Sequence, residues 1–151
     1  MLYLIVEAGG RRYALETTSI VRALPVVRWQ PMPGTAPGVA GVFNCQGDRL
    51  PLLDLRLMIE GEPSVLTMAS RILLLKPDAT GQGLAGLLAE RAIDTISLPA
   101  QQVPGAAEAA SALPFIGRIV TGPDETYRLL DIDTLLAGVT RSLDEPVAEA
   151  A

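Results

Sequence analysis

Short apolar runs, separated by turns rich in glycine and proline, make up most of this chain. Residues 2–8 carry apolar side chains on both faces, which predicts a central strand, and Gly9-Gly10 marks the turn to a returning strand. The same reasoning predicts strands at residues 12–16, 20–24, 39–45, 49–53, 71–76, 84–90, 92–98, 117–122 and 126–130. About ten short strands at roughly even spacing are typical of an all-β barrel protein.

One segment occurs twice. The sequence LLDLRLMIEG at residues 52–61 returns as LLDIDTLLAG at residues 129–138. An apolar pair leads into an aspartate, apolar residues follow at helical spacing, and a glycine closes each copy. This predicts a strand ending in a short helix, with Asp54 or Asp131 as the helix cap and a left-handed glycine at its end. A glutamate followed by Leu-Pro also occurs twice, at 16–25 and 90–99. We interpret the chain as an internal duplication of two similar halves.

The duplication suggests a domain plan. We predict one domain at residues 1–141, with one subdomain at about 1–65 and another at about 66–141. A half of about 75 residues buries too little apolar surface to be stable alone, so the halves should depend on each other. Residues 26–37 contain three prolines and should form an ordered loop. In that loop Trp29 and Met32 either cover the core or contact a partner. Residues 99–114 should form a surface loop, and the acidic tail at 142–151 should be disordered.

The composition excludes several classes of function. Of the 151 residues 49% are hydrophobic and 19% charged, which favours a protein that covers apolar surface with partners. The net charge of −5, with Lys76 as the only lysine, opposes nucleic-acid binding. Histidine is absent and Cys45 is the only cysteine, so the chain offers no Ser-His or Cys-His pair and no cysteine-rich zinc site. We expect no metal, no cofactor and no nucleic-acid partner.

The location follows from the hydropathy. Residues 1–12 contain too few apolar residues for a signal sequence. No run approaches the roughly 18 apolar residues of a membrane span. We predict a cytoplasmic protein without direct membrane contact. Any association with a membrane should occur through a partner.

Two alternatives would make the chain an enzyme or a ligand-binding protein. Asp54 and Asp131 could form an aspartic protease dyad, but the residues that follow them fit helices rather than Asp-Thr-Gly turns, so we interpret both as caps. The other carboxylates are scattered, without the spacing of metal ligands. A β-barrel that binds a small apolar ligand, or acts as an enzyme, stays open as the alternative from another class.

Four motifs follow one another along the chain: Tyr13-Ala14-Leu15, Pro31-Met32-Pro33, Gly41-Val42-Phe43-Asn44-x-x-Gly47 and Leu50-Pro51-Leu52-Leu53-Asp54-Leu55. In this order they resemble the CheW family of chemotaxis coupling proteins, over nearly the whole chain from Leu2 to Gly138. The resemblance implies an all-β fold of two small SH3-like five-stranded β-barrels around a shared core, with short capped helices. It also implies a non-enzymatic adaptor that joins a CheA-type histidine kinase regulatory domain to the cytoplasmic tip of a methyl-accepting chemoreceptor. Recruitment to the inner membrane would then occur through the receptor.

The resemblance further implies where partners bind. An apolar patch in the first half should face the kinase, and the turn after Asn44 should contact a partner. The expected partner-binding residues are Ile20, Arg22, Met32, Val39, Gly41, Val42, Asn44, Gln46 and Arg49.

Two residues depart from the family pattern. Members usually read Asn-Leu-Arg-Gly where this chain has Asn44-Cys45-Gln46-Gly47, and Arg22 stands where a carboxylate is common. Glutamine lacks the charge and the five-donor fork of arginine. We therefore hypothesise that the residue facing Gln46 is neutral or basic, and that the protein pairs poorly with ordinary chemotaxis receptors. The alternative within signalling is a divergent scaffold of a non-flagellar system, such as surface sensing or pilus control.

Overall fold

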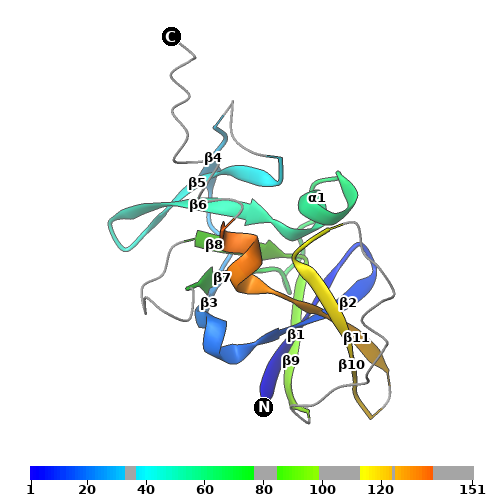
Figure 1. Cartoon of the computed structure of the whole chain (residues 1–151). Helices are drawn as coiled ribbons and strands as arrows, with labels where there is room; N and C mark the ends of the chain where they lie inside the picture. The colour runs from blue at the N-terminus through cyan, green and yellow to red at the C-terminus, as the bar shows by residue number, and fades with distance from the viewer. Residues whose placement is uncertain (33–36, 77–84, 99–112, 124, 138–151) are drawn as a thin grey trace.

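The computed structural model describes all residues except 33–36, 77–84, 99–112, 124 and 138–151. Two sheets dominate it (Figure 1), so the predicted all-β class is confirmed. Sheet A has five strands in the order β10-β11-β2-β1-β9, and sheet B has six in the order β3-β7-β8-β6-β5-β4. The strands are β1 (Leu2–Ala8), β2 (Arg11–Glu16), β3 (Ile20–Pro25), β4 (Trp29–Gln30), β5 (Val39–Cys45), β6 (Asp48–Asp54), β7 (Arg71–Leu75), β8 (Ala85–Ala89), β9 (Arg91–Ser97), β10 (Ile116–Thr121) and β11 (Thr126–Leu130).

The two sheets repeat one topology. Reading across sheet A, the strands β10, β11, β2, β1 and β9 take the places that β5, β6, β8, β7 and β3 take in sheet B, where β4 is added at the edge. Each sheet contains one parallel pair, β11 with β2 in sheet A and β6 with β8 in sheet B. The internal duplication predicted from the repeated segment is therefore confirmed.

The two halves of the sequence are interleaved in these sheets. Strands β1 and β2 precede residue 65 but lie in sheet A with β9, β10 and β11, while β7 and β8 lie in the middle of sheet B. The predicted subdomains at 1–65 and 66–141 thus do not coincide with the sheets. The reason is that the first two strands of each half pair with the third and the last strand of the other half.

Sheet B is strongly curled. Only residues 26–28 separate β3 from β4, although these strands are the two edges of the sheet. Four residue steps span at most about 14 Å, whereas six flat strands at about 4.8 Å spacing would place the edges about 24 Å apart. The sheet must therefore bend until its edges approach each other.

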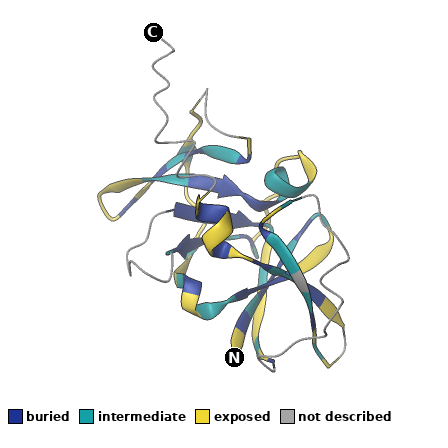
Figure 2. Cartoon of the chain, viewed as in Figure 1, coloured by how far each residue is buried: buried dark blue, intermediate teal, exposed yellow. Residues whose placement is uncertain are grey.

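The core has three parts. A central cluster lies between the sheets and includes Val6 and Leu15 of sheet A with Leu53 and Leu87 of sheet B, all 0% exposed. Sheet A also encloses a cluster around Tyr3 and Ile5, and sheet B one around Phe43, Leu52, Ile72 and Leu88. Figure 2 shows buried positions along the middle strands and exposed positions on the edges. Burial on both faces explains why the middle strands read as continuous apolar runs.

The repeated segment forms a strand and a short helix in both halves. Helix α1 (Leu55–Glu60) follows β6, and the Asp54 side chain accepts a hydrogen bond from the Leu57 N–H. Gly61 ends it in the left-handed conformation, with φ 80°. Residues 132–137 form the second helix, where Asp131 Oδ1 accepts a hydrogen bond from the Thr134 N–H at 3.1 Å. The capping aspartate in each copy of the repeated segment therefore determines where each helix begins.

Glu90, between β8 and β9, ties three segments together. Its Oε1 accepts a hydrogen bond from the Gly9 N–H at 2.8 Å, and its Oε2 accepts from the Val65 N–H at 2.6 Å and from Arg56 Nη1 at 3.1 Å. Burial raises the pKa of Glu90, but the two N–H donors and the Arg56 guanidinium outweigh it, so the pKa lies below its ordinary value.

Some predictions differ from the structure or fall outside it. The loop predicted at 26–37 contains the short strand β4, which pairs with β5 despite the prolines that follow it. The predicted loop at 99–114 lies mostly outside the described residues, and the tail at 142–151 lies wholly outside them. Among the described residues no helix combines the length and the apolar character that crossing a membrane requires.

Candidate partner-binding site

The β4 edge of sheet B is built around a glycine. Strand β4 pairs with β5 through Trp29 opposite Phe43 and Gln30 opposite Val42. Gly41 is buried with φ 156°, and a Cβ placed on it would lie 2.1 Å from the Gln30 carbonyl oxygen. Only glycine allows β4 to approach this closely. Gly41, one of the predicted partner-binding residues, therefore also positions the edge strand.

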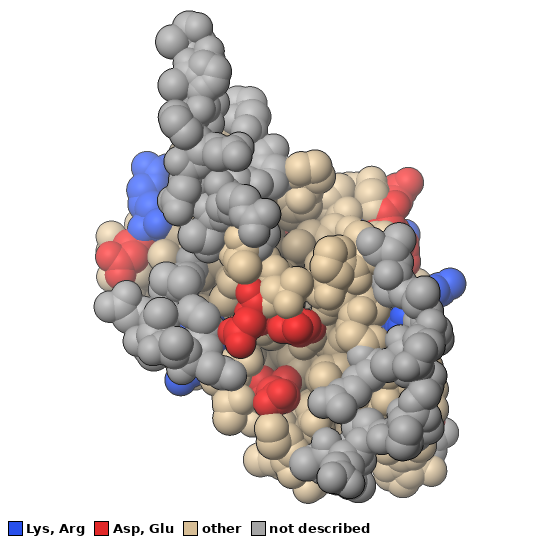
Figure 3. Space-filling model, in the orientation of Figure 1, with Lys and Arg blue, Asp and Glu red and all other residues tan. Residues whose placement is uncertain are grey.

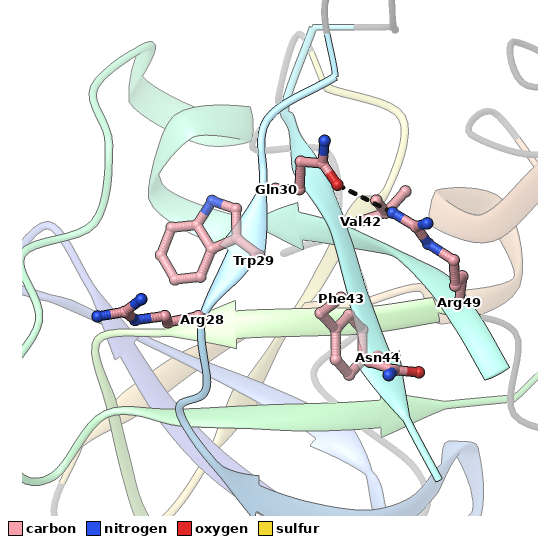
Figure 4. A pocket seen from close by; sticks show the side chains of 7 residues that line it. All are labelled: Arg28, Trp29, Gln30, Val42, Phe43, Asn44 and Arg49. Carbon is pink, nitrogen blue, oxygen red and sulfur yellow. Dashed lines mark hydrogen bonds between the residues drawn. The ribbon is translucent and has the colours of Figure 1, made fainter. Parts of the chain in front are cut away.

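An open cavity of about 340 Å³ lies on this edge. Figure 4 shows side chains from β4, β5 and β6 around it. Its lining residues are Arg28, Trp29, Gln30, Val42, Phe43, Asn44 and Arg49. The predicted residues Val42, Asn44 and Arg49 are thus brought together, and Trp29 both packs on the core of sheet B and lines the cavity.

The cavity is electropositive. Arg28 and Arg49 are both exposed, and the lining residues include no carboxylate. Arg49 Nη2 donates a hydrogen bond to Gln30 Oε1 at 3.0 Å, which holds the guanidinium beside β4 (Figure 4). A lining that includes one indole and two guanidinium groups suits a partner segment that combines an apolar side chain with a carboxylate.

Gln46 lies at the turn between β5 and β6. Its φ is 51°, and the φ of the following Gly47 is 91°. Positive φ at both central residues is the pattern of a tight hairpin turn whose twist matches the flanking strands. Gln46 is exposed there, beyond the Asn44–Arg49 pair of the ladder.

The other predicted residues lie outside the cavity lining. Ile20 and Arg22 lie on β3, the edge strand that the curl of sheet B brings back toward β4 at the other edge. Val39 packs against the central core, and Met32 lies after β4 with 43% of its surface exposed. That Ile20, Arg22, Val39, Gly41 and Val42 form one partner-facing patch stays a prediction.

Arg28 and Gln30 were not among the residues predicted to form the site. Their alternation with Trp29 is a strand signal, but the prolines at 31, 33 and 37 obscured it.

Acidic side chains gather on another face, near the helix at 132–137 (Figure 3). Glu16, Asp131 and Asp133 line a hollow of about 260 Å³ there. Among the residues that the structure describes, no group of three or more such side chains could hold a metal ion. Asp54 lies elsewhere, buried and bonded to Leu57 and Ser64.

Comparison with known proteins places the chain in a class. The model of the CheW-like domain matches residues 2–139. The crystal structure of the scaffolding protein TtCheW from Thermoanaerobacter tengcongensis superposes with a TM-score of 0.68 at 18% identity, covering 85% of this chain and 82% of that one. No curated protein matches the sequence significantly. The chain therefore belongs to the CheW-like domain family, the scaffold proteins of chemotaxis signalling.

Proposed function

We propose that this protein is a non-enzymatic adaptor that couples the cytoplasmic tip of a methyl-accepting chemoreceptor to the regulatory domain of a CheA-type histidine kinase. The match of the CheW-like domain to residues 2–139 carries the proposal. An adaptor needs recognition surfaces rather than a reaction centre, and the β4 edge offers one. The protein acts in the cytoplasm and reaches the inner membrane through the receptor.

The cavity on the β4 edge is the proposed kinase-facing surface. Trp29 is half-buried against the core and presents the rest of its indole to solvent, the position from which aromatic residues anchor interfaces. Arg28 and Arg49 also line the cavity, and its lining residues include no carboxylate. The kinase segment that binds here therefore carries an apolar side chain next to an Asp or Glu.

Binding of the purified kinase regulatory domain tests this surface. We expect Trp29→Ala and Arg49→Gln each to weaken binding about tenfold or more, because each removes an anchor of a desolvated contact. Arg11→Gln removes an exposed arginine on β2 of sheet A and should leave the affinity unchanged. Circular dichroism checks that every variant is folded. Unchanged affinity for both β4-edge variants would exclude this surface, and a wild type that binds no CheA-type regulatory domain would exclude the adaptor function.

Receptor choice is the second part of the test. We propose that the hairpin turn with Asn44 and Gln46 faces the receptor, where the neutral Gln46 disfavours an acidic contact. Binding should therefore be measured with receptor tips from a swimming array and from a surface-sensing or pilus-control system. Tighter binding to the second type supports the divergent scaffold, and tighter binding to the first supports an ordinary array.

A further inference from the structure

The cavity on the β4 edge contains two positive charges that the described part of the chain does not neutralise. Arg28 and Arg49 both line it, and no ion pair among the described residues includes either of them. The hydrogen bond from Arg49 Nη2 goes to the neutral side chain of Gln30. Trp29 adds a partly exposed indole to the lining. The cavity therefore fits a segment that combines carboxylates with apolar side chains.

The sequence of this protein contains such a segment after the second helix. Residues 142–151 read SLDEPVAEAA, with three carboxylates, the apolar side chains of Leu143 and Val147, and no arginine or lysine. They lie outside the described residues, as do the four residues that join them to the helix at 132–137. The chain thus carries the groups that complement the cavity.

The helix at 132–137 is anchored on the face of sheet B that also presents Arg49. Leu135 and Leu136 pack in the central cluster, which contains Leu53 of β6. Side chains two or four residues apart on a strand point to the same face, so Arg49 points to the same side as Leu53. These two positions lie about 13 Å apart along β6. The segment that follows the helix therefore starts on the same face as this arginine of the cavity.

The length of the segment allows it to reach the cavity. Eight residues lead from Ala137 to Glu145, and they span about 26–29 Å when extended. Tethering at this length gives an effective concentration of about 1 mM. At that concentration a dissociation constant of about 0.1 mM keeps the cavity about nine-tenths occupied.

Electrostatics favours the cavity over the surface beside the helix. Glu16, Asp131 and Asp133 line the hollow next to the helix, so an acidic segment is repelled there. Charges act over about 8 Å at physiological ionic strength, so this repulsion and the attraction to the two arginines are both local. The acidic segment is thus driven away from the helix and toward the β4 edge.

We infer that residues 142–149 bind the β4-edge cavity of their own chain, with Asp144 and Glu145 paired to Arg28 and Arg49 and an apolar side chain of the segment on Trp29. The contact covers the surface that we propose for the kinase, so a kinase segment must displace it. The contact itself does not rest on the proposed function, whereas its effect on kinase binding does.

Trp29 is the only tryptophan, so its fluorescence reports on the cavity directly. Removal of residues 142–151 should shift the Trp29 emission to the red and increase its quenching by acrylamide, because the indole is uncovered. A synthetic peptide of residues 142–151 should reverse both changes, and less strongly as salt rises. Arg49→Gln in the truncated protein should weaken peptide binding about tenfold. Arg11→Gln, on β2 of sheet A, should leave it unchanged.

A matched peptide separates ion pairing from unspecific binding. The peptide with Asp144→Asn and Glu145→Gln should not bind, and circular dichroism checks that every protein variant is folded. The difference between the intact and the truncated protein should not depend on protein concentration, because the contact lies within one chain. Identical Trp29 emission with and without residues 142–151, a neutral peptide that binds as well as the acidic one, or a concentration-dependent difference would each overturn the proposal.

Kinase binding distinguishes a failure of this inference from a failure of the proposed function. If the segment occupies nine-tenths of the cavities, its removal should raise the affinity for the kinase regulatory domain about tenfold. A segment that binds the cavity without affecting kinase affinity would contradict the kinase-facing surface and leave the contact within the chain established. A segment that does not bind would overturn the contact, and Trp29→Ala would test the kinase-facing surface independently.

Discussion

Arg56 Nη1 on α1 lies 3.1 Å from Glu90 Oε2, between β8 and β9, so the helix of the first half is bonded to the second half. The same carboxylate accepts the Gly9 N–H from the β1–β2 turn and the Val65 N–H that follows α1. Arg56 also bonds to Glu60 one turn along the helix, at 3.1 Å. One side chain of the second half thereby fixes three segments of the first, beside the core in which the sheets meet.

Replacing Glu90 by Gln tests this network. Its side chain is 12% exposed, and the change removes the charge that three donors share. We expect a loss of about 1–3 kcal/mol in the free energy of unfolding at pH 7. Because the folded-state pKa of Glu90 is lowered, its stabilisation is present above the unfolded-state pKa and disappears as pH falls through the folded-state value. Urea denaturation of both proteins at pH 7 and at decreasing acidic pH measures this. A difference that stays constant down to full protonation would contradict the assignment.

The two helix caps should differ in strength. Asp54 is 3% exposed and accepts hydrogen bonds from the Leu57 N–H, the Ser64 N–H and the Ser64 hydroxyl. Asp54→Ala therefore removes a cap and leaves buried donors unpaired, at a cost of about 2–3 kcal/mol. Asp131 is exposed and has one such bond, to Thr134, so Asp131→Ala should cost only about 0.5–1 kcal/mol. Urea denaturation of the two variants and the wild type measures both losses in the free energy of unfolding. Equal losses would show that the Ser64 hydrogen bonds add nothing to the cap.

Gln46 is the only described residue other than glycine with positive φ. Asparagine tolerates this conformation better than glutamine, and Asn-Gly is the preferred pair for such a turn. We expect Gln46→Asn to raise the free energy of unfolding by about 0.5 kcal/mol, and the melting temperature slightly with it. Gln46→Arg should leave stability unchanged, because arginine has the same conformational cost. Calorimetry checks both, and a destabilised Gln46→Asn would mean that the glutamine side chain makes a stabilising contact.

That conformational match makes Gln46→Arg a clean probe of recognition. If the partner presents an acid opposite the turn, the arginine should gain affinity by about 1–3 kcal/mol in a desolvated contact, and almost nothing in an exposed one. The hypothesis of a neutral or basic facing residue predicts no gain with the cognate receptor and a gain with a standard chemotaxis receptor. Equal gains with both would remove Gln46 as a determinant of specificity.

Residues 1–65 should not fold alone. Sheet B needs β7 and β8 between β3 and β6, and sheet A needs β9, β10 and β11 around β1 and β2. The fragment would leave the central cores open and many strand hydrogen bonds unmade. Far-ultraviolet circular dichroism and urea titration of the fragment should show no cooperative transition. A cooperative transition would mean that the first half can build a sheet from its own strands.

Local features of this protein could be predicted from its sequence because they depend on neighbouring residues. Alternation and apolar runs located the strands, and the Asp54 and Asp131 segments located both helices, since a cap bonds within a few residues of itself. The repeated segment also indicated the duplication. Strand β4 is the local feature that was missed, because the prolines beside Trp29 concealed a two-residue pairing with β5.

Strand partners and surfaces were decided only by the tertiary structure. Every strand offers the same backbone donors and acceptors, so nothing within β1 specifies that it pairs with β9 or that the halves interleave. The cavity shows the same limit: Arg28 and Arg49 face one hollow because β4 folds onto β5 above Gly41. Likewise, only the curl of sheet B brings the β3 edge, which carries Ile20 and Arg22, back toward β4 at the other edge. The apolar pattern determined which side chains are buried, and the packing of complete sheets determined which exposed ones meet.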